Sequence, residues 1–128
     1  MRRVEVRGSR LVGFSVAGGE VRDLSVSDCT LRLSSFAFAK LRDVVFERVD
    51  LAEASFMEAQ LEGVHFIDCE LTGVDFRKAT TKGCTIRGAS LDGVTGVESL
   101  KGITMPWVDV VASAATLASA LGITVEPE

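Results

Sequence analysis

Apolar residues recur along most of this chain with a period of five. From Val6 to Leu91, every position whose number ends in 1 or 6 is apolar, with the exception of Thr81. Two residues before each of these positions lies a second residue that is mostly small and never charged, and the other three positions hold nearly every charge. The pattern therefore predicts two inward-facing and three outward-facing positions in every five residues.

A period of five fits neither an α-helix nor a flat strand. Five residues turn a helix by about 500°, so an apolar stripe of this period would spread around its whole surface. In a strand the side chains alternate with period two, so an odd repeat would change faces each time. If instead the chain bends once in every five residues, all the apolar pairs face one side, and a steady bend gives a coil. We therefore expect an all-β solenoid with one short side per repeat.

A longer repeat of twenty residues lies within this pattern. Positions twenty residues apart form a column: leucine fills the column of positions 11, 31, 51, 71 and 91, and phenylalanine stands at positions 36, 56 and 76 of another. Twenty residues make four sides of five, so we predict a four-sided coil of 20 residues. Successive coils would stack at the strand spacing of about 4.8 Å, with like residues above one another. The predicted core ladder consists of Leu11, Leu31, Phe36, Leu41, Phe46, Leu51, Phe56, Leu61, Phe66, Leu71, Phe76, Ile86 and Leu91.

The repeats resemble those of a known family. The runs ASFME at residues 54–58 and VDFRK at residues 74–78 resemble the A(D/N)LXX motif of pentapeptide-repeat proteins, and many copies share one phase. The resemblance implies a right-handed quadrilateral β-helix and, since many members have no known enzymatic activity, a non-enzymatic protein. The first coil departs from the motif, because Phe14 stands at a small-residue position and Gly18 precedes Gly19. We therefore expect an irregular first coil.

The C-terminal part follows a different pattern. The five-residue register ends at Gly96, and a helical period extends from about Pro106 to Leu121, with Thr104 as its expected N-cap and Gly122 as its expected stop. We predict one domain, in which residues 1–95 form the β-helix and residues 96–128 form a plug, an α-helical cap and a tail. The residues expected to cover the open end of the solenoid are Leu100, Ile103, Trp107, Val110, Val111, Leu117 and Leu121.

Two surfaces are candidates for contact with other proteins. The outward face of the predicted helix carries small residues that suit close packing against a second copy, and C-terminal helices mediate dimerisation in some members of the family that the chain resembles. The alternative is an exposed alanine-rich helix that only caps the solenoid. The second surface is apolar yet outward by register, and it is either a contact site or a set of ordinary exposed side chains. The candidate interface residues are Ala112, Ala115, Thr116, Ser119 and Ala120 on the helix, and Leu33, Phe38 and Met57 on the coils.

Composition is typical of a single globular domain. The 128 residues are 47% hydrophobic and 25% charged, with a net charge of −4. The longest weakly charged stretch, residues 105–123, contains Asp109 and is marginal for a bilayer span, so we expect no membrane segment. Cys29, Cys69 and Cys84 occupy inward positions and lack metal-ligand spacing. An odd number of inward cysteines and a start without a secretory signal favour the cytoplasm.

The sequence offers no set of residues for catalysis. His65 is the only histidine and is outward by register, between Val45 and Thr85 of the neighbouring coils, with no nucleophile or orienting partner assigned to it. No glycine-rich phosphate loop follows a strand and opens a helix. We therefore expect no catalytic residues, no metal and no cofactor. The expected function is that of a binding or scaffold protein whose partners are a second copy of itself and an unidentified protein.

A more specific alternative comes from the same resemblance. Some pentapeptide-repeat proteins are acidic rods that mimic DNA, bind type II topoisomerases such as gyrase and confer quinolone resistance. A DNA mimic needs a continuous negative face, because duplex DNA carries one charge per about 1.7 Å. Residues 1–95 hold 13 lysine and arginine side chains against 14 aspartates and glutamates, so this body is nearly neutral. We keep the DNA mimic as the second hypothesis, and without a basic stripe we expect no direct nucleic-acid binding.

Overall fold

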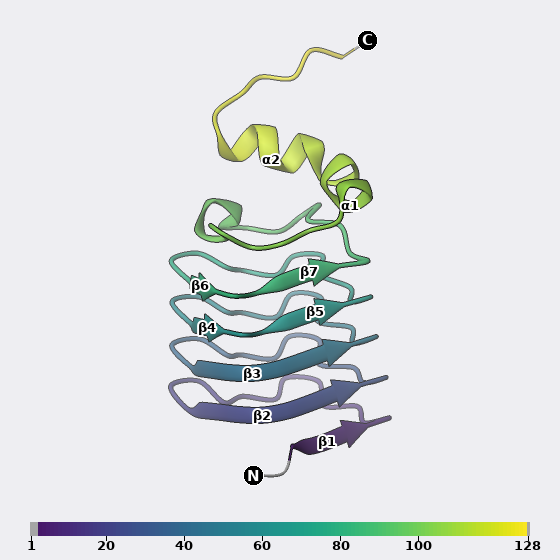
Figure 1. Cartoon of the computed structure of the whole chain (residues 1–128), viewed down its shortest axis with the longest axis vertical. Helices are drawn as coiled ribbons and strands as arrows, with labels where there is room; N and C mark the ends of the chain where they lie inside the picture. The colour runs from purple at the N-terminus through teal and green to yellow at the C-terminus, as the bar shows by residue number, and fades with distance from the viewer. Residues whose placement is uncertain (1–2, 128) are drawn as a thin grey trace.

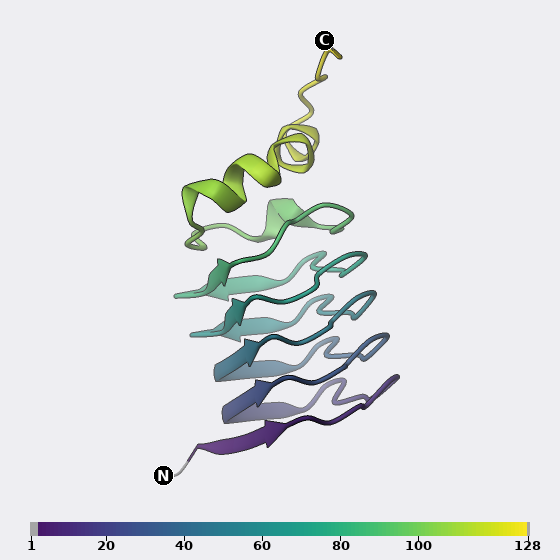
Figure 2. The same cartoon turned by 90° about the vertical axis from the view of Figure 1, so that its right-hand side faces the viewer.

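The chain forms a stack of parallel coils closed by two short helices (Figures 1 and 2). The computed structural model describes residues 3–127. The coil is right-handed and rises from β1 at the lower end to the helices at the upper end (Figure 1), as predicted. The strands are β1 (Val4–Arg7), β2 (Glu20–Ser27), β3 (Lys40–Glu47), β4 (Gln60–Glu62), β5 (His65–Ile67), β6 (Thr80–Lys82) and β7 (Thr85–Arg87). They are followed by the 3₁₀ helix η1 (Val97–Ser99) and by α1 (Trp107–Ala112) and α2 (Ala114–Ala120).

The register between coils is twenty residues, as the sequence predicts. Val6 pairs with Val26, Val26 with Phe46, and both Phe46 and Ile86 with Phe66, always in parallel. The strands form two of the four sides, and isolated parallel bridges with the same offset, such as Arg10 to Thr30 and Ser15 to Ser35, hold the other two. Each residue therefore lies directly above the residue twenty positions earlier.

The corners explain the five-residue bend. From residue 8 to residue 93, every position whose number ends in 3 or 8 has a positive φ. Many of these corners are glycine, which adopts this conformation without steric cost. Others are not, and Leu33 and Phe38 hold φ angles of 61° and 60°. Such a residue is strained by comparison with glycine, and the turn directs its side chain outward.

The core is a ladder of stacked rings and leucines. Phe56 stacks on Phe36 with centroids 4.8 Å apart and on Phe76 with centroids 5.3 Å apart, and it meets Phe46 and Phe66 edge to face. Every residue of the predicted ladder is buried except Leu11. The prediction for Leu11 is wrong, because its coil is the lowest in residues 3–127 and no described coil covers the lower side of this inward-facing residue.

The first coil is more regular than expected. It makes the same bridges and the same corners as the others, with Gly8, Gly13 and Gly18 at positive φ. Phe14 occupies a small-residue position without distorting the backbone, because the open lower end leaves its ring 41% exposed. The sequence departs from the repeat here, but the backbone does not.

The coil also extends past the predicted boundary at residue 95. Thr104 bridges Thr85 with an offset of nineteen residues, so residues 96–104 form part of a further coil. Thr104 is therefore not the helix N-cap, which is Pro106. At Gly96 an added Cβ would lie 2.3 Å from the Arg77 nitrogen, which explains why glycine marks the change of register. The predicted stop is confirmed, since Gly122 has φ 75° and donates its N–H to the Ser119 carbonyl.

Hydrogen bonds to the last coil hold the cap, beside the apolar contact of Leu117 with the core. In the regular coils a corner N–H donates to a carbonyl of the next coil, as Asp68 does to Arg87 at 2.8 Å. At the last coil, Gly88 donates instead to Asp109 Oδ2 at 2.7 Å, and Leu91 donates to Ser113 Oγ at 2.9 Å. The two side-chain oxygens replace carbonyls of a missing coil. Both residues are buried as a result.

This anchoring corrects the predicted orientation of the helix. Because Asp109 and Ser113 face the solenoid, Trp107, Val111 and Leu121 are exposed, contrary to prediction. The other predicted cap residues, Leu100, Ile103, Val110 and Leu117, are buried or half-buried as expected. The helix also divides at Ser113 into α1 and α2. Among the residues that the structure describes, no helix has the length and hydropathy needed to cross a bilayer.

Candidate functional site

The titratable side chains do not converge. Within residues 3–127, no group of three or more histidine, cysteine, aspartate or glutamate side chains is placed to hold a metal ion. His65 lies between Val45 and Thr85 in the ladder, where the sequence places it, and is half-buried.

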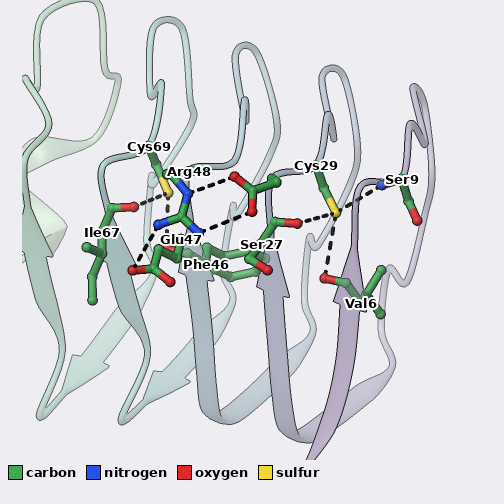
Figure 3. A network of polar contacts seen from close by, with 10 residues as sticks. Val6, Ser9, Ser27, Cys29, Phe46, Glu47, Arg48, Ile67 and Cys69 are labelled. Carbon is green, nitrogen blue, oxygen red and sulfur yellow. Dashed lines mark hydrogen bonds and ion pairs between the residues drawn. The ribbon is translucent and has the colours of Figure 1, made fainter.

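The cysteines belong to the coil structure. All three are free and buried. The Cys69 thiol lies 3.2 Å from the Phe46 carbonyl, to which it donates, and the Cys29 thiol donates to the Ser27 carbonyl at 3.1 Å (Figure 3). Burial raises the pKa of the Cys69 thiol to about 11, so the nucleophilic thiolate is scarce at neutral pH. These thiols fill inward positions, as predicted.

Opposite charges pair across neighbouring coils. Arg48 donates two hydrogen bonds to Asp28, at 2.7 and 3.1 Å, and also contacts Glu47 (Figure 3). The hydrogen bond from Arg48 holds the pKa of the Asp28 carboxyl below its usual value. Arg32 pairs with Asp50 between the same two coils. These arginines interrupt the acidic side chains of this surface, which fits the nearly neutral body expected from the sequence.

The exposed face of α1 is apolar. Trp107 is 78% exposed and Val108 is 71% exposed, and Val111 follows one helical turn later. Ala112 and Ala115 extend this surface, which we call the outer helix face (Trp107, Val108, Val111, Ala112 and Ala115). Sequence reasoning assigned Trp107 and Val111 to the interior and placed Val108 on the outward face, without naming it as an interface residue. The signal that could have oriented the helix is the pair Asp109 and Ser113, two polar residues four positions apart, the first being the one polar residue of α1 and the second following its end.

The candidate interface residues on the helix do not form one face. Ala112 is fully outward, whereas Thr116 turns toward the solenoid and donates to Asp92 Oδ1 at 3.2 Å. Ala115, Ser119 and Ala120 are exposed but border a groove of about 430 Å³, whose floor includes Gly93 and Gly96 of the last coil. Ala112 and Ala115 therefore border the outer helix face, whereas Ala115, Thr116, Ser119 and Ala120 line the groove.

The second candidate surface lies on the corners of the second coil. Leu33 and Phe38 are 56% and 55% exposed, and Met57 of the next coil is half-buried beside them. One coil lower the same corners are Gly13 and Gly18, which leave both side chains uncovered from below. Phe38 lies next to Met57, to whose carbonyl it donates its N–H at 2.9 Å, and Leu33 lies at the preceding corner.

Comparison with known proteins identifies the repeat. The sequence model of the pentapeptide repeat region matches residues 27–95. No curated protein sequence matches the chain.

Several solved structures are similar to this chain. A pentapeptide repeat protein from the thylakoid lumen of Arabidopsis thaliana is 27% identical, with a TM-score of 0.51 over 78% of this chain and 60% of the Arabidopsis chain. This chain therefore spans less than two thirds of that relative. The pentapeptide repeat protein Rfr23 from the cyanobacterium Cyanothece 51142 is 18% identical over 81% of this chain and 85% of its own, with a TM-score of 0.44. QnrB1, a plasmid-mediated fluoroquinolone resistance protein, is 16% identical over 93% of this chain and 100% of its own, with a TM-score of 0.42.

Proposed function

Because this chain belongs to the pentapeptide repeat family, whose proteins are generally structural or binding proteins, we propose that it is a non-enzymatic binding module. We further propose that it works as a homodimer joined through the outer helix face. The observation that carries this proposal is the exposure of Trp107, Val108 and Val111 on a helix that is already anchored to the solenoid.

The composition of the face supports a protein contact. The solvent side of a surface helix normally carries charged and polar residues, but here Asp109, the one acidic residue of α1, is turned inward. A tryptophan flanked by valines and alanines resembles the centre of an interface, where truncation of one aromatic residue often costs about 2 kcal/mol or more. The hydrogen bonds of Asp109 and Ser113 fix α1 on a rigid support, which lowers the entropy lost on association.

A second copy is the partner that fits this face most simply. A two-fold axis uses the same patch twice, so an apolar face with few charges is complementary to itself. The small side chains of Ala112 and Ala115 at this face allow two helices to approach closely. The rods would then extend away from a common helical centre.

The test is the mass in solution at low micromolar concentration, measured by light scattering. We expect twice the chain mass of 13.7 kDa for the intact protein and the single mass for the double variant Trp107→Glu with Val111→Glu. Val125→Glu is the matched control, because Val125 is also exposed but lies in the tail beyond α2, and this variant should remain a dimer. A monomeric intact protein, or a glutamate pair that leaves the mass unchanged, contradicts the proposal.

Two further parts of the proposal follow from the site geometry. We propose that the protein contains no metal or cofactor, and a stoichiometric metal in elemental analysis of the purified protein would overturn this. We also propose the patch formed by Leu33, Phe38 and Met57 as a contact for a different protein, because two large apolar side chains are exposed at corners where glycine would be less strained. Residence in the cytoplasm stays a prediction.

A further inference from the structure

The lower end of the solenoid is an open β-edge. In the second coil, Thr30 donates its N–H to Ser9 at 2.9 Å and accepts from Leu11 at 2.8 Å. Ser35 makes the corresponding bonds to the first coil. Their counterparts in the first coil, Arg10 and Ser15, have no coil beneath them within residues 3–127, and β1 is the lowest strand (Figure 1). Unpaired strand edges of this kind readily pair with another chain.

Core side chains are uncovered at the same end. Val4 is exposed, as are Leu11 and Phe14, whereas Leu31, directly above Leu11, is 4% exposed. The upper end differs, because Asp109 and Ser113 occupy its backbone donors. Among residues 3–127, one end of the rod is therefore closed by its own chain, while the other presents apolar surface and backbone groups that no further coil pairs.

We propose that β1 pairs with β1 of a second copy of this chain, antiparallel and centred on Val6, so that two β-helices meet end to end. The outward residues of β1 are Glu5 and Arg7, on either side of Val6. A two-fold axis at Val6 places each Glu5 opposite Arg7 of the second copy. Opposite charges that face each other across strands stabilise the pairing.

The hydrogen-bonding pattern selects the same register. Gly8 donates its N–H to the Ser27 carbonyl in the second coil, at 3.2 Å. The N–H and C=O groups of successive residues point in alternate directions along a strand. The backbone groups of Glu5 and Arg7 therefore point away from the second coil, toward the open edge. Facing Glu5 and Arg7 would then exchange both backbone hydrogen bonds, as one kind of antiparallel residue pair does. Registers centred on Glu5 or Arg7 would bring like charges together instead.

Charge also favours a second copy over an unrelated strand. Glu5 and Arg7 take part in none of the ion pairs among residues 3–127, so both are available for a partner. Their order around Val6 is self-complementary, which is what an isologous contact requires. A strand of four residues is a smaller contact than the outer helix face, so this pairing should be seen at higher concentration. If both contacts form, the rods join into an open chain.

The experiment isolates this contact by a charge exchange. All proteins carry Trp107→Glu and Val111→Glu, which remove the helix contact, and their mass is followed by sedimentation into the high micromolar range. The parent should dimerise, and Glu5→Arg or Arg7→Glu alone should weaken the dimer at least tenfold. An equimolar mixture of the two single variants should recover a heterodimer, and one chain carrying both exchanges should recover the homodimer. Since Glu5 and Arg7 are exposed, all variants should melt like the parent.

The outcomes separate this inference from the proposed function. A parent that stays monomeric, single variants that dimerise like the parent, or a mixture that fails to recover association would each overturn the β1 pairing. None of these results bears on the helix dimer, which is measured at low micromolar concentration in a chain with an intact outer helix face. Loss of association in both single variants together with recovery in the mixture supports the register centred on Val6.

Discussion

Truncation of Phe56 to alanine should be among the most damaging single changes in this protein. Its side chain is fully buried, with Phe36 and Phe76 stacked on its two faces at 4.8 and 5.3 Å. A buried Phe→Ala change costs about 3–5 kcal/mol, since it removes apolar contacts and leaves a cavity. The loss of two stacked pairs, each of about 0.5–1.5 kcal/mol, places Phe56→Ala near the upper end of that range. Domains of this size are stable by about 5–15 kcal/mol, so the variant should be marginal at best.

The matched control is Phe14→Ala in the lowest coil. Phe14 is 41% exposed, and no coil of residues 3–127 lies beneath it, so its truncation should cost only about 1–2 kcal/mol. Urea unfolding followed by circular dichroism gives both values. Equal costs for Phe14→Ala and Phe56→Ala would refute the stacked ladder. So would a cost below about 1.5 kcal/mol for Phe56→Ala, because truncation of a fully buried ring should lower the free energy of unfolding by more than that.

Two other predictions follow from the polar groups. Arg48 lowers the pKa of Asp28, so the stabilisation from this pair is present above the unfolded carboxyl pKa of 3.8 and is lost as the pH falls through the lower folded value. Calorimetry should therefore find Arg48→Gln less stable than the parent at neutral pH, and a difference that persists undiminished in strong acid would be inconsistent with the pairing. Burial raises the pKa of Cys69 to about 11, so iodoacetamide should alkylate Cys69 at mildly alkaline pH only as fast as the protein unfolds. Labelling of the folded protein at the rate of a free thiol would show this prediction to be wrong.

The repeating part of the fold could be predicted from the sequence because each position carries the same information many times. A single apolar residue indicates little, but the leucine column from Leu11 to Leu91 fixes both the coil length and the inward face. The exception, Leu11, depends on what lies below the first coil, and the repeat pattern contains no information about the end of a stack. Thr104 is a similar case, because a coil shortened by one residue still bridges Thr85.

The helical cap could not be oriented from hydrophobic periodicity alone. The pattern correctly located a helical segment and its end at Gly122, but it assumed that the apolar face covers the solenoid. The end of a β-stack presents unpaired N–H groups, and burying these without acceptors costs more than exposing a few apolar side chains. Asp109 and Ser113 supply those acceptors, so the helix turns its polar pair inward and Trp107 outward. The candidate interface is therefore centred on Trp107 and not on the small residues of the helix.

The fluorescence of Trp107 provides the most direct test that the outer helix face joins two copies. Trp107 is the only tryptophan of the chain, so its emission reports this surface alone. At concentrations where light scattering gives the dimer, the emission should be blue-shifted and protected from acrylamide quenching, and dilution to the monomer should shift it to the red with full quenching. A Trp107 that remains fully quenchable in the dimer would contradict the account, because the two copies would then be joined elsewhere.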